Sequence, residues 1–402
     1  MARSQAKDGR FPWRAGNRYQ LLNDGEQFFP AMLHAIAHAQ QHILLDIYLF
    51  ESGNIANQFI DAFITAAERG VQLYLLLDDF GARGLQLTDR RRLQHPSIHL
   101  AFYNPMHYGT MRRNLFRDHR KLLIVDQRIA FTGGAGLTDE FDSQTHPLHS
   151  WHDVMLSIRG PVVSDWQHTF SQSWNLWGSP PLSLTEITQP TAGGGPGRVS
   201  LNTPSRMEIK RSLINRIRGA EKSVWIATAY FIPSWKIRRL LRHAAHRGVD
   251  VRLLLPGPHT DHPSVRHAGR RFYGRLLLNG VRIFEYQPRF LHAKMLLCDD
   301  WLSIGSSNID RWNLRWNLEA NQELLGGEVI EQAYTLFSRD FEQSHEISHD
   351  FWRARPWYRR LPEWFWGKID RWLERCTRHN RKSRDNRKNQ APGATGGDEK
   401  KG

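Results

Sequence analysis

The chain has 402 residues, of which 40% are hydrophobic and 24% charged, and this balance excludes a disordered, collagen-like or coiled-coil protein. Lysine and arginine total 55 against 40 aspartates and glutamates, a net charge of +15 that indicates an anionic partner such as phospholipid, nucleic acid or a phosphorylated substrate. The two cysteines, Cys298 and Cys376, are too few for a disulfide framework or a cysteine-based zinc site.

The sequence contains no apolar run of 18 or more residues, and it opens on a polar segment. It therefore predicts neither a transmembrane helix nor a secretion signal. Together with the scarcity of cysteine, this pattern favours a protein of the reducing, cytoplasmic side of the cell.

The first predicted elements are a strand, a helix and a second strand over residues 43–81, and the same order returns at 224–257. In both units the second strand follows Arg-Gly-Val, at residues 69–71 and, 178 residues later, at 247–249. The strands are short, continuous apolar runs, as in strands buried on both faces of a sheet, and the helices have apolar residues at helical spacing. This repetition predicts βαβ units in a largely parallel sheet, built twice.

A segment rich in proline and glycine interrupts this pattern over residues 178–197 and is predicted to be the linker between two similar domains. The first domain then covers residues 1–177 and the second covers 198–350. A basic, tryptophan-rich segment follows over residues 351–388, and residues 389–402 are expected to be disordered.

Each predicted domain contains one copy of the pattern His-x-Lys-x4-Asp, as HRKLLIVD over residues 119–126 and HAKMLLCD over residues 292–299. Each copy precedes a turn of small residues, Gly-Gly in the first domain and Gly-Ser-Ser-Asn in the second. The repeated residues are His119, Lys121, Asp126, His292, Lys294 and Asp299. Because side chains alternate along a strand, the histidine and lysine of one copy lie on the same face.

Two such pairs that face each other would form a site with two imidazoles and two ammonium groups. This set suits a phosphodiester: one imidazole attacks phosphorus, the other protonates the leaving oxygen, and the lysines neutralise the phosphoryl oxygens. A metal site is disfavoured, because the histidines lack carboxylates at ligand spacing and the lysines would repel a cation. Asp126 and Asp299 lie five residues beyond their lysines and are expected to be structural hydrogen-bond partners at strand ends.

An imidazole nucleophile needs a hydrogen-bond acceptor on its other nitrogen to fix its tautomer. Two acidic residues lie on predicted strands after the small-residue turns: Asp153, 34 residues after His119, and Glu319, 27 residues after His292. We therefore expect Asp153 to support His119 and Glu319 to support His292.

The doubled motif with its small-residue turns resembles the phospholipase D superfamily. Residues 16–345, including the segments NRYQLLNDGEQFFPAMLHAI and FEYQPRFLHAKMLLCDDWLSIGSSNID, resemble bacterial cardiolipin synthases of the B type. The resemblance implies two similar α/β domains, each a mixed, largely parallel sheet flanked by helices, related by a pseudo-twofold axis with one active site between them. It also implies a covalent phosphohistidine intermediate, with His119 as the nucleophile, and no cofactor. The catalytic triplets fall on the six motif residues, and the phosphate-side asparagine falls on Asn308.

Two positions depart from the family pattern. The first turn has Gly136 where the family has an asparagine, so a polar contact is either missing from that half or supplied by Thr138. After the second turn, Asn313 stands where the family has a serine.

By this resemblance, the expected activity is phosphatidyl transfer from phosphatidylglycerol, or another phospholipid, to a second phosphatidylglycerol, with release of glycerol. A phospholipase D-type hydrolase or a nuclease is the alternative within the superfamily. A non-catalytic binding protein is disfavoured because both histidine–lysine pairs are intact. The expected partners are anionic phospholipids and the membrane surface, without nucleic acid or an obligate protein partner.

The C-terminal segment favours a membrane over nucleic acid. Residues 353–388 contain 13 basic and 4 acidic residues, and five tryptophans lie within residues 352–372, partly at helical spacing. Such a helix would lie in a membrane interface, which predicts peripheral binding at the cytoplasmic face of the cell inner membrane. It could instead pack its tryptophans on the catalytic core, or bind single-stranded nucleic acid.

Two basic segments, residues 107–117 and 264–277, precede the two motifs and are candidates for the lipid entrance. Arg266, Arg270 and Arg275 in the second segment would bind the acceptor's phosphate, or they would form a solvated helix face.

Overall fold

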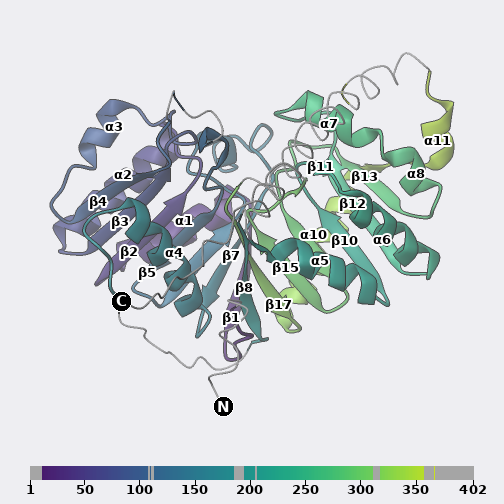
Figure 1. Ribbon diagram of the computed structural model, residues 1–402. Coiled ribbons are helices and arrows are strands. Elements are labelled where there is room, and N and C mark those ends of the chain that lie inside the picture. The colour runs from purple at the N-terminus through teal and green to yellow at the C-terminus, as the bar shows by residue number, and fades with distance from the viewer. Residues whose placement is uncertain are drawn as a thin grey trace, which may run out of the picture.

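The computed structural model describes residues 11–106, 109, 113–184, 194–203, 206–310, 317–356 and 366. In these residues the chain forms two α/β halves that lie side by side, each built around its own sheet (Figure 1). The expected fold of two similar α/β domains is confirmed.

The first half has a seven-stranded sheet in the order β1-β7-β6-β5-β2-β3-β4. Its strands are β1 (Arg18–Asn23), β2 (His42–Ile47), β3 (Gln72–Asp78), β4 (Ile98–Tyr103), β5 (Lys121–Val125), β6 (Ile129–Gly133) and β7 (Val154–Arg159). Its helices are α1 (Gly25–Ala37), α2 (Asn54–Glu68), α3 (Leu87–Arg92) and α4 (Val163–Trp177), with the 3₁₀ turns η1 (Arg113–Leu115) and η2 (Asp139–Phe141).

The second half has a nine-stranded sheet in the order β18-β13-β12-β10-β14-β15-β17-β8-β9, and a separate pair of short strands, β11 and β16. Its strands are β8 (Gly197–Thr203), β9 (Arg206–Met207), β10 (Ser223–Ala227), β11 (Phe231–Ile232), β12 (Asp250–Pro256), β13 (Arg282–Tyr286), β14 (Met295–Cys298), β15 (Trp301–Gly305), β16 (Ile309–Asp310), β17 (Glu319–Leu325) and β18 (Ser344–Glu346). Its helices are α5 (Glu208–Gly219), α6 (Trp235–His246), α7 (Pro263–Arg270), α8 (Tyr273–Leu277), α10 (Glu328–Glu342) and α11 (His349–Ala354).

Both main sheets are mixed. Parallel pairing joins β2, β3 and β4 in the first half and β10, β12 and β13 in the second, whereas the motif strands pair antiparallel with their neighbours. The sheets therefore contain less parallel pairing than the βαβ pattern alone predicts. The reason is that β5 and β6, and likewise β14 and β15, are joined by only three and two residues, a connection that allows only an antiparallel pair.

The repeated Arg-Gly-Val segment ends a helix in each half. Gly70 and Gly248 follow α2 and α6 with φ angles of 91° and 87°, a left-handed conformation that glycine adopts without strain. The arginine before each glycine donates to a backbone carbonyl at the end of the neighbouring helix, at 3.1 Å for Arg69 beside α1 and 2.9 Å for Arg247 beside α5. The repeat thus ends one helix and binds the C-terminal end of the helix before it.

The two halves share a continuous hydrophobic core. One buried cluster includes residues of both sheets together with α4 and α10. Helices α1 and α2 cover the other face of the first sheet, and α5, α6 and α8 cover that of the second. Within the shared cluster, Trp166 of α4 donates from Nε1 to Gln322 of β17, at 2.8 Å. Close packing across the boundary holds the halves in one arrangement.

The predicted linker falls between α4, which ends at Trp177, and β8, which begins at Gly197. Its residues 185–193 lie outside the described part of the chain. Near the other end of the first predicted domain, Arg14 pairs with Gly197 and Trp13 packs against the core of the second half. Among the described residues, no helix combines the length and the apolar character needed to cross a bilayer.

The predicted tryptophan-rich segment begins with α11. Trp352 on this helix is buried, and its ring lies 4.8 Å from that of Tyr273. Trp366 is partly buried against the same core. These two tryptophans follow the packing alternative, while the other residues beyond 356, including 389–402, lie outside the described part of the chain.

Candidate active site

Two short β-bridges cross from one half to the other and bring the two motifs together. The residue before each motif histidine pairs with the residue before the acid of the other half: Asp118 with Leu318, and Leu291 with His152. The exchange is reciprocal, as a pseudo-twofold relation between the halves requires. Both motif histidines therefore lie at the boundary between the halves.

Each histidine is hydrogen-bonded to the acid of the opposite half. His119 Nδ1 lies 3.1 Å from the Glu319 carboxylate, and His292 Nδ1 lies 2.6 Å from Asp153. The expectation that each acid supports the histidine of its own half is wrong, because the inter-half bridges bring each acid beside the other half's histidine. With Nδ1–H donated to a carboxylate, Nε2 is the nitrogen left for chemistry.

The two lysines fold back over their own histidines. Lys121 Nζ donates to the carbonyl oxygen of His119 at 2.6 Å, and Lys294 Nζ donates to that of His292. Lys294 Nζ also lies 3.1 Å from His292 Nε2. Each motif thus places an ammonium group beside an imidazole, as the alternation of strand side chains predicts.

Burial controls the protonation of these four groups. It lowers the pKa of His119 against the attraction of Glu319 and, together with the Lys294 ammonium, lowers the pKa of His292 to about 4. Burial also lowers the pKa of Lys121 to about 7 and that of Lys294 to about 8. Both imidazoles are therefore neutral near pH 7, the state in which Nε2 is a nucleophile. A phosphodiester anion in the site would favour the protonated form of each group.

Asn308 lies in the turn after β15 and is buried. Its Oδ1 accepts from the Thr228 hydroxyl at 3.3 Å, while its Nδ2 has no hydrogen-bond partner among the described residues. A buried donor without a partner costs roughly 1–3 kcal/mol, and a phosphoryl oxygen would satisfy it. This geometry fits the phosphate-side role that the resemblance assigns to Asn308.

The first half has glycine, not asparagine, at the equivalent position. A Cβ on Gly136 would lie 2.8 Å from Leu49, so a larger side chain does not fit without movement. The Thr138 hydroxyl donates to Glu140 and does not take over the role of the missing amide. The site is therefore asymmetric at this point. The other departure, Asn313, lies outside the described residues.

The small-residue turns serve the two acids in different ways. A Cβ on Gly134 would lie 2.4 Å from a carboxylate oxygen of Asp153, so this glycine leaves room for the acid. In the second turn, the Ser306 hydroxyl donates to Glu319. One turn clears space for its acid, and the other adds a hydrogen bond to it.

The aspartates of the motifs lie at the far end of the strands, away from the histidines. Asp126 accepts three backbone N–H groups of residues 40–42, at 2.8–3.0 Å. Asp299 accepts three from residues 221–223, each at 2.9 Å. Both have positive φ, 50° and 51°. Their contacts are those of structural turn residues, as expected from their positions, and not of groups that touch a substrate.

Aromatic residues that the sequence analysis did not select surround both histidines. The ring of Tyr48 lies 4.7 Å from that of His119 and 5.1 Å from Lys121 Nζ. The ring of Trp151 lies 5.1 Å from that of His292. Their signals in the sequence are weak: Tyr48 directly follows the buried strand β2, and Trp151 comes two residues before Asp153.

The arginines expected near the lipid entrance have a different partner. Arg266 and Arg270 lie 2.9 Å and 3.5 Å from the carboxylate of Glu285 on β13. These two arginines neutralise a buried acid. This role differs from the two expected from the sequence, which were binding a phosphate and forming a solvated helix face. Arg275 is exposed on α8, and most of residues 107–112 lie outside the described part of the chain.

Comparison with known proteins places this geometry in a family. A family profile described as "Cardiolipin synthase, PLD-like domain" matches residues 32–174 and 213–341. Cardiolipin synthase B of Shigella flexneri is 37% identical over 323 residues, which cover 77% of this chain and 76% of that protein. The Escherichia coli K12 protein of the same name is 36% identical, and the match covers the same fractions of the two chains.

A solved structure gives the same fold. Phosphatidylserine synthase of Haemophilus influenzae Rd KW20 matches with a TM-score of 0.70, covering 92% of this chain and 95% of that one. At 13% identity, this likeness concerns the fold alone. The profile match over both motif segments and the relatives matched over three quarters of their length lead to one conclusion: the chain belongs to the phospholipase D-like cardiolipin synthases.

Proposed function

We propose that this enzyme transfers a phosphatidyl group from phosphatidylglycerol, or another phospholipid, to a hydroxyl of a second phosphatidylglycerol, producing cardiolipin and releasing glycerol. The observation that carries the proposal is the crossed pairing of His119 with Glu319 and of His292 with Asp153 in one buried site. A neutral His119 as nucleophile, and a His292 that becomes protonated at Nε2 when the phosphodiester anion binds, suit a double displacement at phosphorus.

In the first step, His119 Nε2 attacks the phosphorus of the donor lipid. A P–N bond forms and the bond from phosphorus to the glycerol oxygen breaks. His292, protonated at Nε2 once the phosphodiester anion is bound, gives that proton to the glycerol oxygen. The closer carboxylate, Asp153 at 2.6 Å against 3.1 Å for Glu319, supports His292 in this role, because it stabilises the imidazolium that carries the proton.

In the second step, the now neutral His292 takes the proton of the acceptor's hydroxyl. The acceptor oxygen attacks phosphorus, and the P–N bond to His119 breaks. Lys121, Lys294 and Asn308 would stabilise the negative charge on the phosphoryl oxygens in both steps. With water in place of the lipid hydroxyl, the same steps give phosphatidic acid, which is the hydrolase alternative.

Peripheral binding to the cytoplasmic face of the inner membrane is part of the proposal. The net charge of +15 supports attraction to anionic lipid. Large apolar side chains are also exposed: Phe80 (47% exposed) just after β3, Leu115 (53%) in η1, four residues before His119, and Trp235 (60%) at the start of α6. Such side chains can enter the headgroup region of a bilayer.

The decisive experiment incubates the purified full chain with labelled phosphatidylglycerol and separates the products by chromatography. Cardiolipin together with glycerol is the expected result. Phosphatidic acid alone would make the protein a hydrolase. Cleavage of nucleic acid without any turnover of lipid would overturn the proposal. His119→Ala is the matched control, because it removes the proposed nucleophile.

A further inference from the structure

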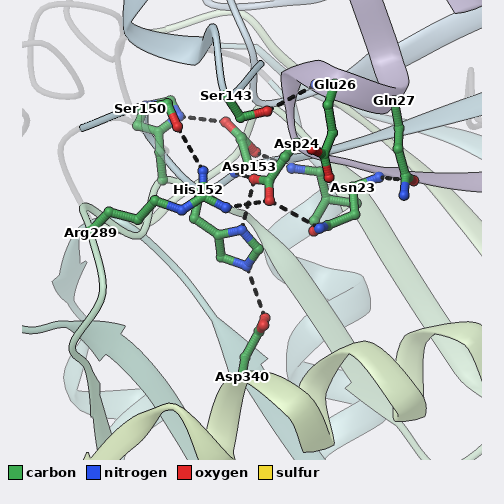
Figure 2. Close-up of polar contacts among 12 residues, drawn as sticks. Asn23, Asp24, Glu26, Gln27, Ser143, Ser150, His152, Asp153, Arg289 and Asp340 are labelled. Atoms are coloured by element: carbon green, nitrogen blue, oxygen red, sulfur yellow. Dashed lines mark hydrogen bonds and ion pairs between the residues drawn. The ribbon is translucent and has the colours of Figure 1, made fainter. Parts of the chain in front are cut away.

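A buried ionic cluster lies next to Asp153 (Figure 2), the acid that is hydrogen-bonded to His292. His152, the residue before Asp153, is fully buried, with an exposed fraction of 0%. Its Nδ1 lies 2.8 Å from Asp24, at the start of α1, and its Nε2 lies 3.0 Å from Asp340, on α10 of the other half. Because ionised carboxylates only accept hydrogen bonds, both ring nitrogens must donate, and the ring is an imidazolium.

The groups around His152 balance its charge. Asp24 also accepts from Arg289 of the second half, which in turn donates to Ser150 at 2.8 Å. Tyr286 of β13 stacks on the imidazole at 5.0 Å between ring centroids. In addition, Arg339 lies 3.6 Å from the carboxylate of Asp340. The cluster thus joins two acids of opposite halves through one histidine, with arginines at its rim.

The charge of His152 is stable near neutral pH. Burial alone would lower its pKa, but the carboxylates of Asp340 and Asp24 outweigh burial and raise the pKa of His152 to about 9. The pKa of Asp24 is lowered against the effect of burial by His152 and Arg289. Removing the proton would leave one carboxylate facing a ring nitrogen without hydrogen, which is a costly contact in a buried site.

The cluster is connected to His292 through the backbone. Asp24 makes two hydrogen bonds to the backbone of Asp153. The N–H of Asp24 donates to the Asp153 carbonyl at 2.9 Å, and the Asp24 carboxylate accepts from the Asp153 N–H at 3.2 Å. The carbonyl of His152 accepts from the N–H of His292 at 2.8 Å. A shift of the 152–153 peptide would therefore move both the main chain of His292 and the carboxylate that orients its ring.

The acid of the other pair is supported differently, since Glu319 accepts from the Ser306 hydroxyl. The residue before Glu319 is Leu318, which occupies the place of His152 in the reciprocal β-bridge. A leucine there satisfies the fold, so the ionic cluster is not needed to form the bridge itself. The difference between His152 and Leu318 therefore indicates that the ionic cluster serves the His292–Asp153 pair.

We infer that His152 is a positioning residue: a buried imidazolium that ties Asp24 of the first half to Asp340 of the second and thereby holds Asp153 where it orients His292. The inference deepens the proposed function, because it names what holds the general acid in place. It rests on charge at the centre of the cluster, and variants that keep or remove that charge test it.

The first test compares His152→Arg, which keeps a cation with several donors, with the neutral His152→Gln. Turnover of phosphatidylglycerol in detergent micelles is measured well below the thermal midpoint, with the folded fraction checked by circular dichroism. We expect kcat to fall about tenfold or more in His152→Gln with little change in KM, and His152→Arg to stay within about threefold of the wild type. Full kcat in His152→Gln, or an equal loss in both variants, would overturn the inference.

The second test does not depend on turnover. In the full chain labelled with ¹⁵N-histidine, the resonances of His152 are identified by their loss in His152→Arg. We expect the shifts of a doubly protonated ring at pH 7.5, and a titration that moves to lower pH in Asp340→Asn but not in the surface control Glu346→Gln. A neutral ring at pH 7.5 would overturn the inference. A protonated ring in a protein that does not turn over phosphatidylglycerol would contradict the proposed function alone.

Discussion

The two motif histidines differ at the scale of single atoms. The acid on His292 is closer than the acid on His119, 2.6 Å against 3.1 Å, and the His292 side chain is less exposed, 8% against 13%. These differences suit different tasks. A close carboxylate stabilises the imidazolium that forms at His292 when the anionic substrate binds, whereas a nucleophile has to remain neutral until it attacks.

A leaving group that needs no proton should separate the two roles. With a phosphatidyl p-nitrophenol substrate, we expect His292→Asn to release a burst of p-nitrophenol and to accumulate the phosphoenzyme, because p-nitrophenolate leaves without general acid help. His119→Asn should give no burst. With phosphatidylglycerol, both variants should lose roughly three orders of magnitude or more in turnover.

Acid quench of the His292→Asn reaction, followed by peptide mapping, provides the direct measurement. The phosphoryl label should lie on the peptide that contains His119. A burst in His119→Asn, or a wild-type label on the peptide that contains His292, would reverse the assignment of nucleophile and acid.

The lysines should set an alkaline limit to activity. The pKa of Lys121 is about 7 and that of Lys294 about 8 in the free protein, and each loses its positive charge as the pH rises through these values. Because kcat/KM reports the free enzyme, it should fall above about pH 7 to 8, while kcat should hold to higher pH, since bound phosphate favours the charged lysines. Both profiles can be measured with a soluble short-chain substrate, and identical profiles would contradict this account.

Asn308 should matter for turnover and not for stability. Asn308→Ala removes an amide donor that no described residue satisfies, and Thr228 keeps another acceptor, the Tyr230 carbonyl at 3.1 Å. We expect kcat to fall about 10²-fold while the thermal midpoint stays level or rises. A lower thermal midpoint with unchanged kcat would show that the residue is structural.

At the scale of elements, each motif strand has a catalytic end and a structural end. The histidine and lysine lie at or just before its start. Five residues after the lysine, the aspartate holds the loop that leads into the neighbouring antiparallel strand, β2 or β10. The motif is continuous in sequence, but its histidine and lysine belong to the site and its aspartate stabilises a loop at the other end of the strand. The contacts of Asp126 and Asp299 predict an effect on folding when either is replaced.

Asp299→Ala is expected to lower the free energy of unfolding by about 3 kcal/mol. It removes the acceptor of three backbone N–H groups and leaves alanine at a positive φ, two changes that are each costly. The kcat of the remaining folded enzyme should be unchanged. Asp300→Ala, at the exposed neighbour, is the control and should shift stability by less than about 0.5 kcal/mol. Denaturant unfolding and active-site titration measure the two quantities separately.

The repeated elements could be predicted from the sequence because buried strands and amphipathic helices leave local patterns. The Arg-Gly-Val repeat is a further local signal, since glycine is required where φ is positive. No local sequence pattern indicates that Asp153 and Glu319 each pair with the histidine of the other half. Separation along the chain carries no information about which strand end lies across the domain boundary, so the nearer acid was the natural but wrong choice. His152 was missed because its partners lie 128 and 188 residues away.

At the scale of the whole molecule, the two halves are joined by a shared core and by the crossed site. Contact with the membrane depends instead on side chains at the surface. Trp352 is buried on the second half and Trp366 partly so, which leaves fewer tryptophans for a membrane than the composition of the C-terminal segment indicates. The exposed side chains of Phe80, Leu115 and Trp235 are the second candidate for membrane contact.

Truncation after residue 356, which keeps α11 and Trp352, separates these two surfaces. We expect the shortened protein to sediment less with phosphatidylglycerol vesicles and to lose activity on them, because it lacks most of the basic charge of the tail. Activity on a short-chain soluble substrate should change less. Trp235→Ser in the full chain tests the exposed apolar side chain at the start of α6 in the same assay. Unchanged vesicle binding after truncation would assign the membrane contact to the core.

The exchange of acids between the halves also has a consequence for protein synthesis. A ribosome completes the first half, with His119 and Lys121, before the strand that carries Glu319 exists. Until the second half has folded against the first, His119 lacks the carboxylate that fixes its tautomer, and Asp153 has no imidazole to orient. We therefore expect the nascent chain to be inactive toward phospholipids. Activity should appear only when β17, which carries Glu319, has folded against the first half.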